Sequence, residues 1–406
     1  MKTSRKKILI ISHALEIGGA ERALIGLLNS FDYSQYQVDL FLCRQEGELY
    51  SYIPKEVNIL PMNQARYLAV PMINLVKDKQ WKMLYGRLKA KWLARKTVKK
   101  QQLKPENQVE LTYSHKYTYK YLDFINLDVE YDFAISFLTP HYICMNKCRA
   151  KKKMAWIHTD YSTIDIDVEA ELNMWKPYDY IASISDKCTE TFLSKLSLLE
   201  NKIIRIDNII TRDMIIDQSC EFIPEDITRQ NNEYILCSIG RFSYAKNFDN
   251  VPCICKKILD KGIKIKWYLI GFGGDEELIS NKIKEHHMEN YVVILGKKIN
   301  PYPYIKACDF YVQPSRYEGK AITVREAQIL CKPVIITGFP TAKSQLEDGY
   351  DGIIVPMDNE SCAKEIVDFI NNNELQKKII DNLAQNDYSN ADEINKIYDL
   401  IGDGDE

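Results

Sequence analysis

The feature that most constrains this chain is a repeating pattern in which short apolar, β-branched runs alternate with stretches of helical periodicity. Such alternation is typical of parallel β-sheets layered with helices. In the first half of the chain, strands are expected at residues 7–12, 37–43, 57–60, 133–137, 154–157, 180–183 and 203–206. In the second half, they are expected at residues 234–239, 265–270, 292–295, 310–313, 333–337 and 352–355. The pattern therefore predicts two doubly wound α/β domains.

The length of 406 residues suits two domains of roughly 200 residues each. We expect an N-terminal domain over residues 1–207 and a C-terminal domain over residues 233–390. The polar segment 208–232, which contains Pro224, is expected to link them. Residues 391–406 are expected to hold the end of a last helix and a disordered acidic tail.

Composition excludes several classes of protein. The chain is 46% hydrophobic and 27% charged, which is ordinary for a soluble globular protein. Its eleven cysteines include no Cys and His pairs at the spacing of a structural zinc site, so we expect reduced thiols and no metal. No run approaches the roughly 18 apolar residues of a membrane-spanning helix, and the first apolar run is too short for a signal peptide.

Positive charge is concentrated between Lys77 and Lys104. That segment holds eleven Lys and Arg residues and one acid, Asp78. The net charge of the whole chain is −2, so the rest of the chain carries about −12. The larger side chains Trp81, Leu84, Tyr85, Leu88 and Trp92 fall on one face of a helix.

This helix could lie in the interface of an anionic membrane, with its tryptophans at headgroup depth. The alternative is an amphipathic helix that packs on its own domain and exposes a basic face. Nucleic acid is a third possibility that nothing else in the chain supports. Contacts with a membrane or an acceptor are assigned to Trp81, Lys82, Arg87, Lys89, Trp92 and Arg95.

Two glutamates, Glu318 and Glu326, stand eight positions apart where a helical pattern follows the expected strand 310–313. In α/β proteins, ligands bind at the carboxyl ends of strands, and a helix start offers free N–H groups to phosphate. A carboxylate would repel phosphate, so the two acids are expected to face hydroxyl groups or a developing cation. A sugar nucleotide offers both.

Arg241 and Lys246 lie in a loop after the expected strand 234–239. A guanidinium fork and an ammonium suit a diphosphate, and a pair of unrelated surface cations is the alternative. Gly18 and Gly19 follow the first strand, where they either admit a ligand close to the backbone or form a tight turn. They do not complete the GxGxxG dinucleotide fingerprint, because the last glycine is missing.

His158 ends the expected strand 154–157, and a site residue and a structural histidine are equally good interpretations there. The glycines between residues 271 and 274 could line a ligand. Three acids follow them at residues 275–277, which argues against phosphate contact and suits a helix N-terminus.

Taken in this order, the motifs resemble those of the retaining glycosyltransferases of family 4, which have the two-domain GT-B fold. The resemblance covers about residues 8–380 and is strongest in the second half. It rests on Gly18-Gly19-Ala20-Glu21-Arg22, Gly240-Arg241 with Lys246-Asn247, the glycine loop 271–274, and Glu318 with Glu326. It implies two Rossmann-like domains that face each other across a cleft.

The resemblance also implies a role for each residue. Arg241 and Lys246 would hold the donor diphosphate and stabilise the leaving group, and Glu326 would bond the ribose. Glu318 would lie near the transferred sugar, with His158 beside the reacting centre. The first glycine loop, Gly18 and Gly19, would close on the donor. Phosphate or sugar hydroxyls would be contacted by the backbone N–H groups of Gly319, Lys320, Ala321 and Ile322.

The activity so implied is metal-independent transfer of a hexose, without a cofactor, from a nucleotide sugar such as a UDP-sugar. The implied acceptor is a glycan or a lipid-diphosphate-linked glycan in the biosynthesis of a surface polysaccharide such as capsule or lipopolysaccharide. The implied location is cytoplasmic, peripheral at the inner face of the cytoplasmic membrane. Departures from the family pattern at Lys320, Arg325 and Gly274 bear on which sugar is transferred.

Two other functions are compatible with this architecture. A nucleotide-sugar epimerase of the same fold would need an acid or histidine arrangement for elimination and re-addition, which the sequence does not reveal. A catalytically silent partner could bind a glycan or lipid carrier for another transferase. The intact set of Arg241, Lys246, Glu318 and Glu326 argues against that partner.

Overall fold

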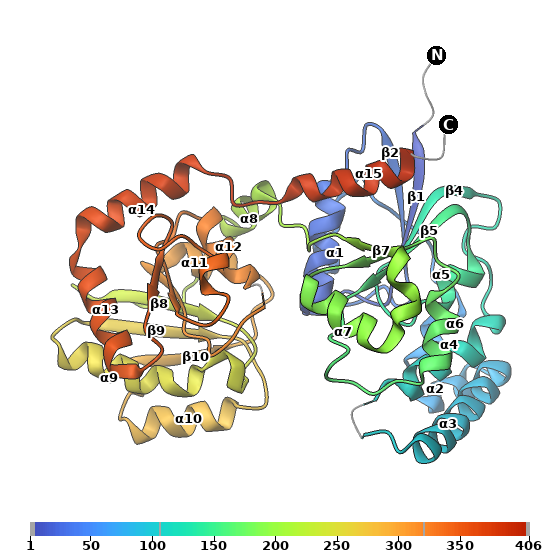
Figure 1. Ribbon diagram of the computed structural model, residues 1–406, viewed down its shortest axis with the longest axis horizontal. Coiled ribbons are helices and arrows are strands. Elements are labelled where there is room, and N and C mark those ends of the chain that lie inside the picture. The colour runs from blue at the N-terminus through green and yellow to red at the C-terminus, as the bar shows by residue number, and fades with distance from the viewer. Residues whose placement is uncertain (1–4, 105–106, 320, 403–406) are drawn as a thin grey trace. The chain divides into compact units, whose positions relative to one another are not determined.

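The computed structural model describes residues 5–104, 107–319 and 321–402. Within these ranges the chain forms two compact units, each built on its own parallel β-sheet (Figure 1). The first unit contains Met1–Ile209 together with Ala391–Glu406, and the second contains Ile210–Asn390.

The sheet of the first unit has the strand order β3-β2-β1-β4-β5-β6-β7. Its strands are β1 (Lys6–Ser12), β2 (Tyr36–Leu42), β3 (Asn58–Ile59), β4 (Glu130–Ser136), β5 (Arg149–Ile157), β6 (Tyr180–Ser183) and β7 (Ile203–Arg205). Its helices are α1 (Gly19–Ser30), α2 (Met72–Lys77), α3 (Trp81–Gln101), α4 (Val109–Thr118), α5 (Tyr142–Lys147), α6 (Val168–Trp175), α7 (Asp186–Leu196) and α15 (Ile394–Gly402).

The sheet of the second unit has the strand order β10-β9-β8-β11-β12-β13. Its strands are β8 (Tyr234–Ile239), β9 (Ile265–Ile270), β10 (Val292–Gly296), β11 (Phe310–Gln313), β12 (Val334–Thr337) and β13 (Ile353–Val355). Its helices are α8 (Arg212–Ser219), α9 (Val251–Asp260), α10 (Glu276–Glu285), α11 (Tyr302–Ala307), α12 (Ile322–Ile329), α13 (Asn359–Asn371) and α14 (Asn373–Gln385).

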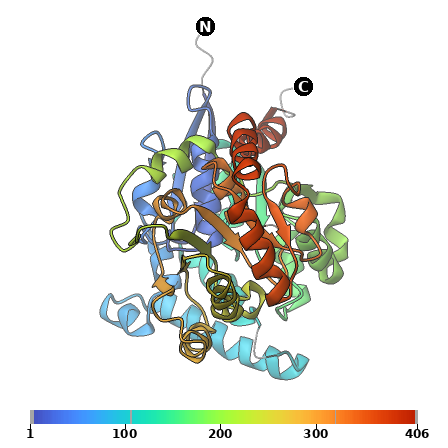
Figure 2. The same cartoon turned by 90° about the vertical axis from the view of Figure 1, so that its left-hand side faces the viewer.

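Helices cover both faces of the second sheet, which explains why its strands read as unbroken apolar runs. Leu236 points into a cluster that includes side chains of α9, α10 and α13. The next residue, Cys237, points into a separate cluster with side chains of α8, α11 and α12. In Figure 2 the red helix pair α13–α14 can be followed along this unit.

The strands lie where the apolar runs predict them, within a few residues at their ends. The expected linker 208–232 differs from the observed division, because from Ile210 onward its residues belong to the second unit and form helix α8. Polar residues on the exposed side of α8 give this segment the composition of a linker. Of the expected acidic tail, residues 403–406 lie outside the described residues.

The last helix, α15, is a separate element that packs on the first unit. The Tyr398 ring stacks on Tyr36 with 4.4 Å between centroids, and its hydroxyl accepts a hydrogen bond of 2.8 Å from the backbone N–H of Asp32. The Lys152 ammonium donates to the carbonyl of Leu400 at 3.0 Å. Helix α15, close to the C-terminus, therefore belongs to the unit that begins with β1.

Candidate active site

The loops after β8 and β11 lie where the strand order of the second sheet reverses. From β8 the chain moves to β9 on one side, and later returns to β11 on the other side of β8. Open α/β sheets bind ligands beside the carboxyl ends of strands at such a point. Arg241 and Lys246 lie in the loop after β8, and Glu318 lies in the loop after β11.

The structure brings Lys246 and Glu318 into direct contact. The Lys246 Nζ lies 2.6 Å from Oε1 of Glu318, and the two side chains are 20% and 10% exposed. The same oxygen accepts hydrogen bonds from Ser315 Oγ at 2.6 Å and from Gln313 Nε2 at 3.1 Å. No donor among the described residues reaches Oε2 of Glu318. One carboxylate oxygen is thus held by three donors, while the other is available to a ligand.

Gln313 and Ser315 are functional candidates that the sequence analysis missed. The Gln313 amide oxygen accepts from the Tyr311 hydroxyl at 2.7 Å, and its amide nitrogen also donates to Ser315 at 2.8 Å. Both residues are fully buried although they are polar. Polar side chains at the end of an otherwise apolar strand were the available signal.

The two loops are fixed to each other by hydrogen bonds. The Arg316 guanidinium makes a two-fold ion pair with Asp249, at 2.8 and 2.7 Å. Asn247 adopts a left-handed conformation with φ of 60°, which asparagine tolerates, and its amide donates to the Pro314 carbonyl at 2.8 Å. Lys246, which lies between these anchors, is therefore held in place before any ligand binds.

Arg241 differs from Lys246 because its guanidinium is exposed and pairs with no other described residue. Its neighbour Phe242 is fully buried and anchors the loop in the core. The Lys246 stem packs over Gly240, where an added Cβ would lie 3.1 Å from the Lys246 Cε. The loop thus presents one free cation and one that is engaged with a carboxylate.

The N-terminus of α12 follows Glu318, and its N-cap residue Ala321 provides no side-chain cap. An uncapped helix start offers N–H groups and a partial positive charge to an anion. Gln345 braces the preceding loop, because its Oε1 accepts from the Ala321 N–H at 2.8 Å and its Nε2 donates to the Gly319 carbonyl at 3.0 Å. Ile322 begins the helix, and Lys320 lies outside the described residues.

Glu326 lies on α12 and is only 5% exposed. Its Oε1 accepts a hydrogen bond of 3.0 Å from the hydroxyl of Tyr302 on α11. A neighbouring helix therefore orients this carboxylate, and its contact with a ribose stays a prediction.

The glycine loop after β9 supports the Arg241 loop through close backbone packing. A Cβ at Gly271 would lie 1.9 Å from the carbonyl oxygen of Gly240, and one at Gly273 would lie 2.2 Å from that of Phe242. Only glycine permits such an approach. This packing accounts for both glycines without a ligand.

In the first unit, Gly18 and Gly19 follow β1 and open α1. A Cβ at Gly18 would lie 2.1 Å from Oε2 of Glu21, whereas no atom lies within 4 Å of a Cβ added at Gly19. The Glu21 carboxylate is the movable end of a side chain, so this contact does not by itself require glycine at position 18, and the backbone beside Gly19 is open. Closure of this loop on a donor stays a prediction.

His158 follows β5, and its ring centroid lies 4.4 Å from that of Phe137. Its Nε2 is buried without a hydrogen-bond partner. Burial lowers the pKa of His158 to about 3, so the ring is neutral near pH 7.

Three further histidines belong to the same unit, and the sequence analysis missed them. His13 follows β1 and stacks on His115 of α4 at 5.3 Å, while His141 Nδ1 lies 2.8 Å from Ser136 Oγ at the end of β4. The Nδ1 of His115 and the Nε2 of His141 are buried without partners. Burial, followed by the charge of Arg44, lowers the pKa of His13 to about 4, and burial also lowers the pKa values of the other two.

Helix α3 packs on its own domain through small side chains and leaves its aromatic residues exposed. The buried positions are Met83, Gly86, Ala90 and Ala94. Trp81 is 59% exposed and Trp92 is 63% exposed, and Tyr85 and Leu88 between them are also exposed. Lys82, Lys89 and Arg95 are exposed as well.

Arg87 is not part of this exposed face. It is half-buried, and its guanidinium donates to the carbonyls of Tyr67, at 3.0 Å, and Val70. Burial lowers the pKa of Arg87. Its assignment to a membrane or acceptor contact conflicts with this structural role.

In residues 5–104, 107–319 and 321–402, no three His, Cys, Asp or Glu side chains gather as a metal site would require. In the same ranges, none of the helices combines the length and the apolar character needed to span a bilayer.

Residues 220–386, which lie within the second unit, match the family model described as glycosyl transferases group 1. An uncharacterized glycosyltransferase of Methanocaldococcus jannaschii is 29% identical over 258 residues, which is 57% of this chain and 62% of that protein. An N-acetylgalactosamine-N,N'-diacetylbacillosaminyl-diphospho-undecaprenol 4-alpha-N-acetylgalactosaminyltransferase of Campylobacter jejuni is 23% identical over 176 residues, 40% of this chain and 47% of that protein. The chain thus spans less than two thirds of the length of these relatives.

A solved structure of HepE from Anabaena in complex with UDP and glucose resembles the whole chain. Its TM-score is 0.62 at 17% identity, and the match covers 98% of this chain and 100% of HepE. Together with the two parallel sheets, this likeness establishes the GT-B fold, in which each unit is Rossmann-like.

Proposed function

We propose that the protein is a retaining glycosyltransferase that moves a hexose from a nucleotide sugar, a UDP-sugar, to a glycan or lipid-diphosphate-linked acceptor. The observation that carries the proposal is the contact between Lys246 and Glu318 at the reversal point of the second sheet. The group 1 match over residues 220–386 supports it, as do a solved neighbour with UDP and glucose and a relative named for a diphospho-undecaprenol substrate.

The chemistry of sugar transfer fits the charges of this site. When the bond between sugar and diphosphate breaks, negative charge grows on the leaving phosphate and positive charge grows on the anomeric carbon. Arg241 and Lys246 would stabilise the leaving group, which accounts for transfer without a metal ion or cofactor. The unoccupied oxygen of Glu318 would accept from a sugar hydroxyl, Glu326 would bond the ribose, and His158 would lie beside the reacting carbon.

The exposed face of α3 supports attachment to an anionic membrane. Its stripe of Trp81, Tyr85, Leu88 and Trp92 would enter the headgroup region, while Lys82, Lys89 and Arg95 would contact anionic lipids. A lipid-linked acceptor at the inner face of the cytoplasmic membrane would then be within reach of the first unit. The role in surface polysaccharide biosynthesis, such as capsule or lipopolysaccharide, follows from such an acceptor.

Incubation with UDP-sugars labelled in the sugar, and with polyprenyl-diphosphate-linked sugars, tests the proposal. A transferase releases UDP and passes the label to the acceptor with the anomeric configuration retained. An epimerase converts the sugar without passing it on, and a silent partner releases no UDP. Either of the last two results would refute the proposed function.

A further inference from the structure

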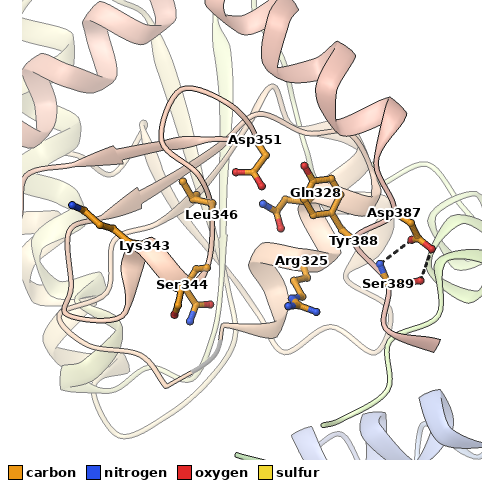
Figure 3. Close-up of a pocket in the computed structure, with 10 residues that line it drawn as sticks. Arg325, Gln328, Lys343, Ser344, Leu346, Asp351, Asp387, Tyr388 and Ser389 are labelled. Carbon is orange, nitrogen blue, oxygen red and sulfur yellow. Dashed lines mark hydrogen bonds between the residues drawn. The ribbon is translucent and has the colours of Figure 1, made fainter. Parts of the chain in front are cut away.

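A hollow in the second unit is lined by neither Lys246 nor Glu318. Its volume is about 320 Å³, within the range of small-molecule sites. The residues that line it are Arg325, Gln328, Lys343, Ser344, Gln345, Leu346, Asp351, Asp387, Tyr388 and Ser389 (Figure 3). They come from α12, from the segments around 343–346 and 351, and from the stretch 387–389 just before the boundary between the units.

Gln328 is the most informative residue of this pocket. Its side chain is fully buried, and neither its Oε1 nor its Nε2 has a hydrogen-bond partner. A buried amide without partners costs roughly 1–3 kcal/mol for each unsatisfied group. Such a residue lining a hollow is explained when a ligand supplies one donor and one acceptor.

The charged groups around Gln328 narrow the chemistry of that ligand. The Arg325 guanidinium is partly exposed and pairs with no other described residue, so it is free to bind an anion. Burial raises the pKa of Asp351, although hydrogen bonds from the Glu347 N–H and the Tyr388 hydroxyl act to lower it. In Figure 3 the side chains of Arg325, Gln328 and Asp351 surround the hollow. Lys343 extends away from it. A second carboxylate of the lining, Asp387, accepts hydrogen bonds of 2.9 Å from the N–H and the hydroxyl of Ser389. One cation, one amide and two carboxyl groups suit a ligand whose single anionic group contacts Arg325 and whose hydroxyl groups face the carboxylates.

We propose that this pocket binds a sugar phosphate, with the phosphate on Arg325 and the sugar hydroxyls on Gln328 and Asp351. A lone inorganic phosphate would leave most of the hollow empty. Nucleotide binding at Lys246 does not require this site, so the pocket would hold a second ligand.

The pocket wall is bonded to the loop that carries Glu318. Gln345 lines the hollow, and its amide braces Gly319 and Ala321. Nearby, the Thr341 hydroxyl donates to the carbonyl of Glu318 at 2.7 Å. A bound sugar phosphate would restrict this segment and so favour the loop geometry needed for donor binding. This coupling, unlike the binding itself, rests on the proposed function.

Calorimetric titration and thermal unfolding of the full chain test the proposal with glucose 6-phosphate, glucose 1-phosphate, inorganic phosphate and methyl glucoside as probes. At least one sugar phosphate should bind and raise the melting temperature, and methyl glucoside should not. Arg325→Gln and Gln328→Leu should each weaken that binding by roughly tenfold or more, because each removes bonds to the ligand. Lys378→Ala on α14 removes an exposed cation elsewhere and should change nothing.

Two controls separate this site from the donor site. Lys246→Ala should bind the sugar phosphate as the unaltered chain does, and Arg325→Gln should bind UDP as the unaltered chain does. Gln328→Leu should melt at the same or a higher temperature without ligand, because it removes two unsatisfied groups.

The proposal is overturned if neither sugar phosphate binds, if binding survives both pocket variants, or if Lys246→Ala abolishes it. Binding of phosphate with an affinity equal to that of the sugar phosphates would also overturn it, because the hydroxyl contacts would then be absent. Failure of UDP to bind would instead count against the proposed function alone.

Discussion

The two units place different chemistry at the same position of a similar sheet. In the second unit, the loops at the strand reversal carry a preformed ion pair, Lys246 with Glu318, and a free cation, Arg241. In the first unit, uncharged histidines follow β1, β4 and β5, and two of them, His141 and His158, have a buried nitrogen without a hydrogen-bond partner. The second unit therefore presents charged side chains at its strand ends, whereas the first unit presents buried, uncharged imidazoles.

Removing the cations of the second unit should have the largest effect. Lys246→Ala or Arg241→Ala should lower turnover by roughly 100-fold or more, the usual loss for one preorganised group that stabilises developing charge. Steady-state rates of UDP release measure this, with Lys378→Ala as the matched control. Near-normal rates in both variants would contradict the role of these cations.

The neutral histidines should make the first unit sensitive to acid. The pKa of His13 is about 4 and that of His158 about 3 in the folded chain, against an ordinary value of 6.5. As pH falls below 6.5, the unfolded chain takes up protons that the folded chain does not, so the free energy of unfolding falls until the folded values are reached. Each such group should remove roughly 1–3 kcal/mol by about pH 4.

Urea unfolding across this pH range, followed by tryptophan fluorescence, measures the effect. His115→Leu should reduce the dependence on pH, whereas His287→Asn, an exposed histidine of the second unit, should leave it as it is. An unfolding free energy that stays constant from neutral pH to about pH 4 would show that these histidines are not buried as described.

In the glycine loop 271–274 of the second unit, Gly274 should tolerate substitution by alanine and Gly271 should not. Gly271→Ala places a Cβ 1.9 Å from the Gly240 carbonyl at a φ of +148°, so it should lower the free energy of unfolding by roughly 1–3 kcal/mol. Gly274→Ala, where no atom lies within 4 Å, is the control and should stay within about 0.5 kcal/mol. Thermal unfolding compares the two, and equal melting temperatures would refute the packing role of Gly271.

Single substitutions on the exposed face of α3 should have the smallest effects, which concern the free energy of binding to anionic membranes. Replacing Lys82, Lys89 or Arg95 by glutamine should weaken binding to anionic vesicles by about 1 kcal/mol for each charge, and added salt should weaken it further. Trp81→Ser with Trp92→Ser should also weaken it.

Vesicle flotation measures this binding. Ile223→Ser, which alters an exposed apolar residue of the second unit, should have no effect. Flotation that is absent with anionic lipids, or unchanged in all these variants, would contradict membrane attachment.

The sequence predicts the sheets well because buried parallel strands leave a simple signal. Runs such as 234–239 and 310–313 are apolar on both faces and end at polar or turn residues, so their bounds follow directly. Lys246 and Glu318 could be found for the same reason, since each lies just after such a run. Their contact could not be predicted, because 72 residues separate them and the pairing depends on β8 and β11 being neighbours.

Other features left no usable signal. His13, His115 and His141 are far apart in sequence, and only the order of strands brings them into one unit near His158. The residues that line the pocket around Gln328 are likewise spread along the sequence, from Arg325 to Ser389, so no local motif predicts it. In helix α3 the sequence did show the aromatic stripe, but it did not show whether the stripe is buried or exposed. The stripe is exposed because Gly86 and Ala90 lie on the face that packs on the domain.

A crystal structure of the full chain with bound UDP tests whether Lys246 and Arg241 hold the diphosphate. We expect diphosphate oxygens within hydrogen-bond distance of the Lys246 ammonium and the Arg241 guanidinium, with Lys246 drawn from Glu318 toward the phosphate. UDP bound elsewhere, or bound in the second unit while both cations remain out of reach of its phosphates, would contradict the account.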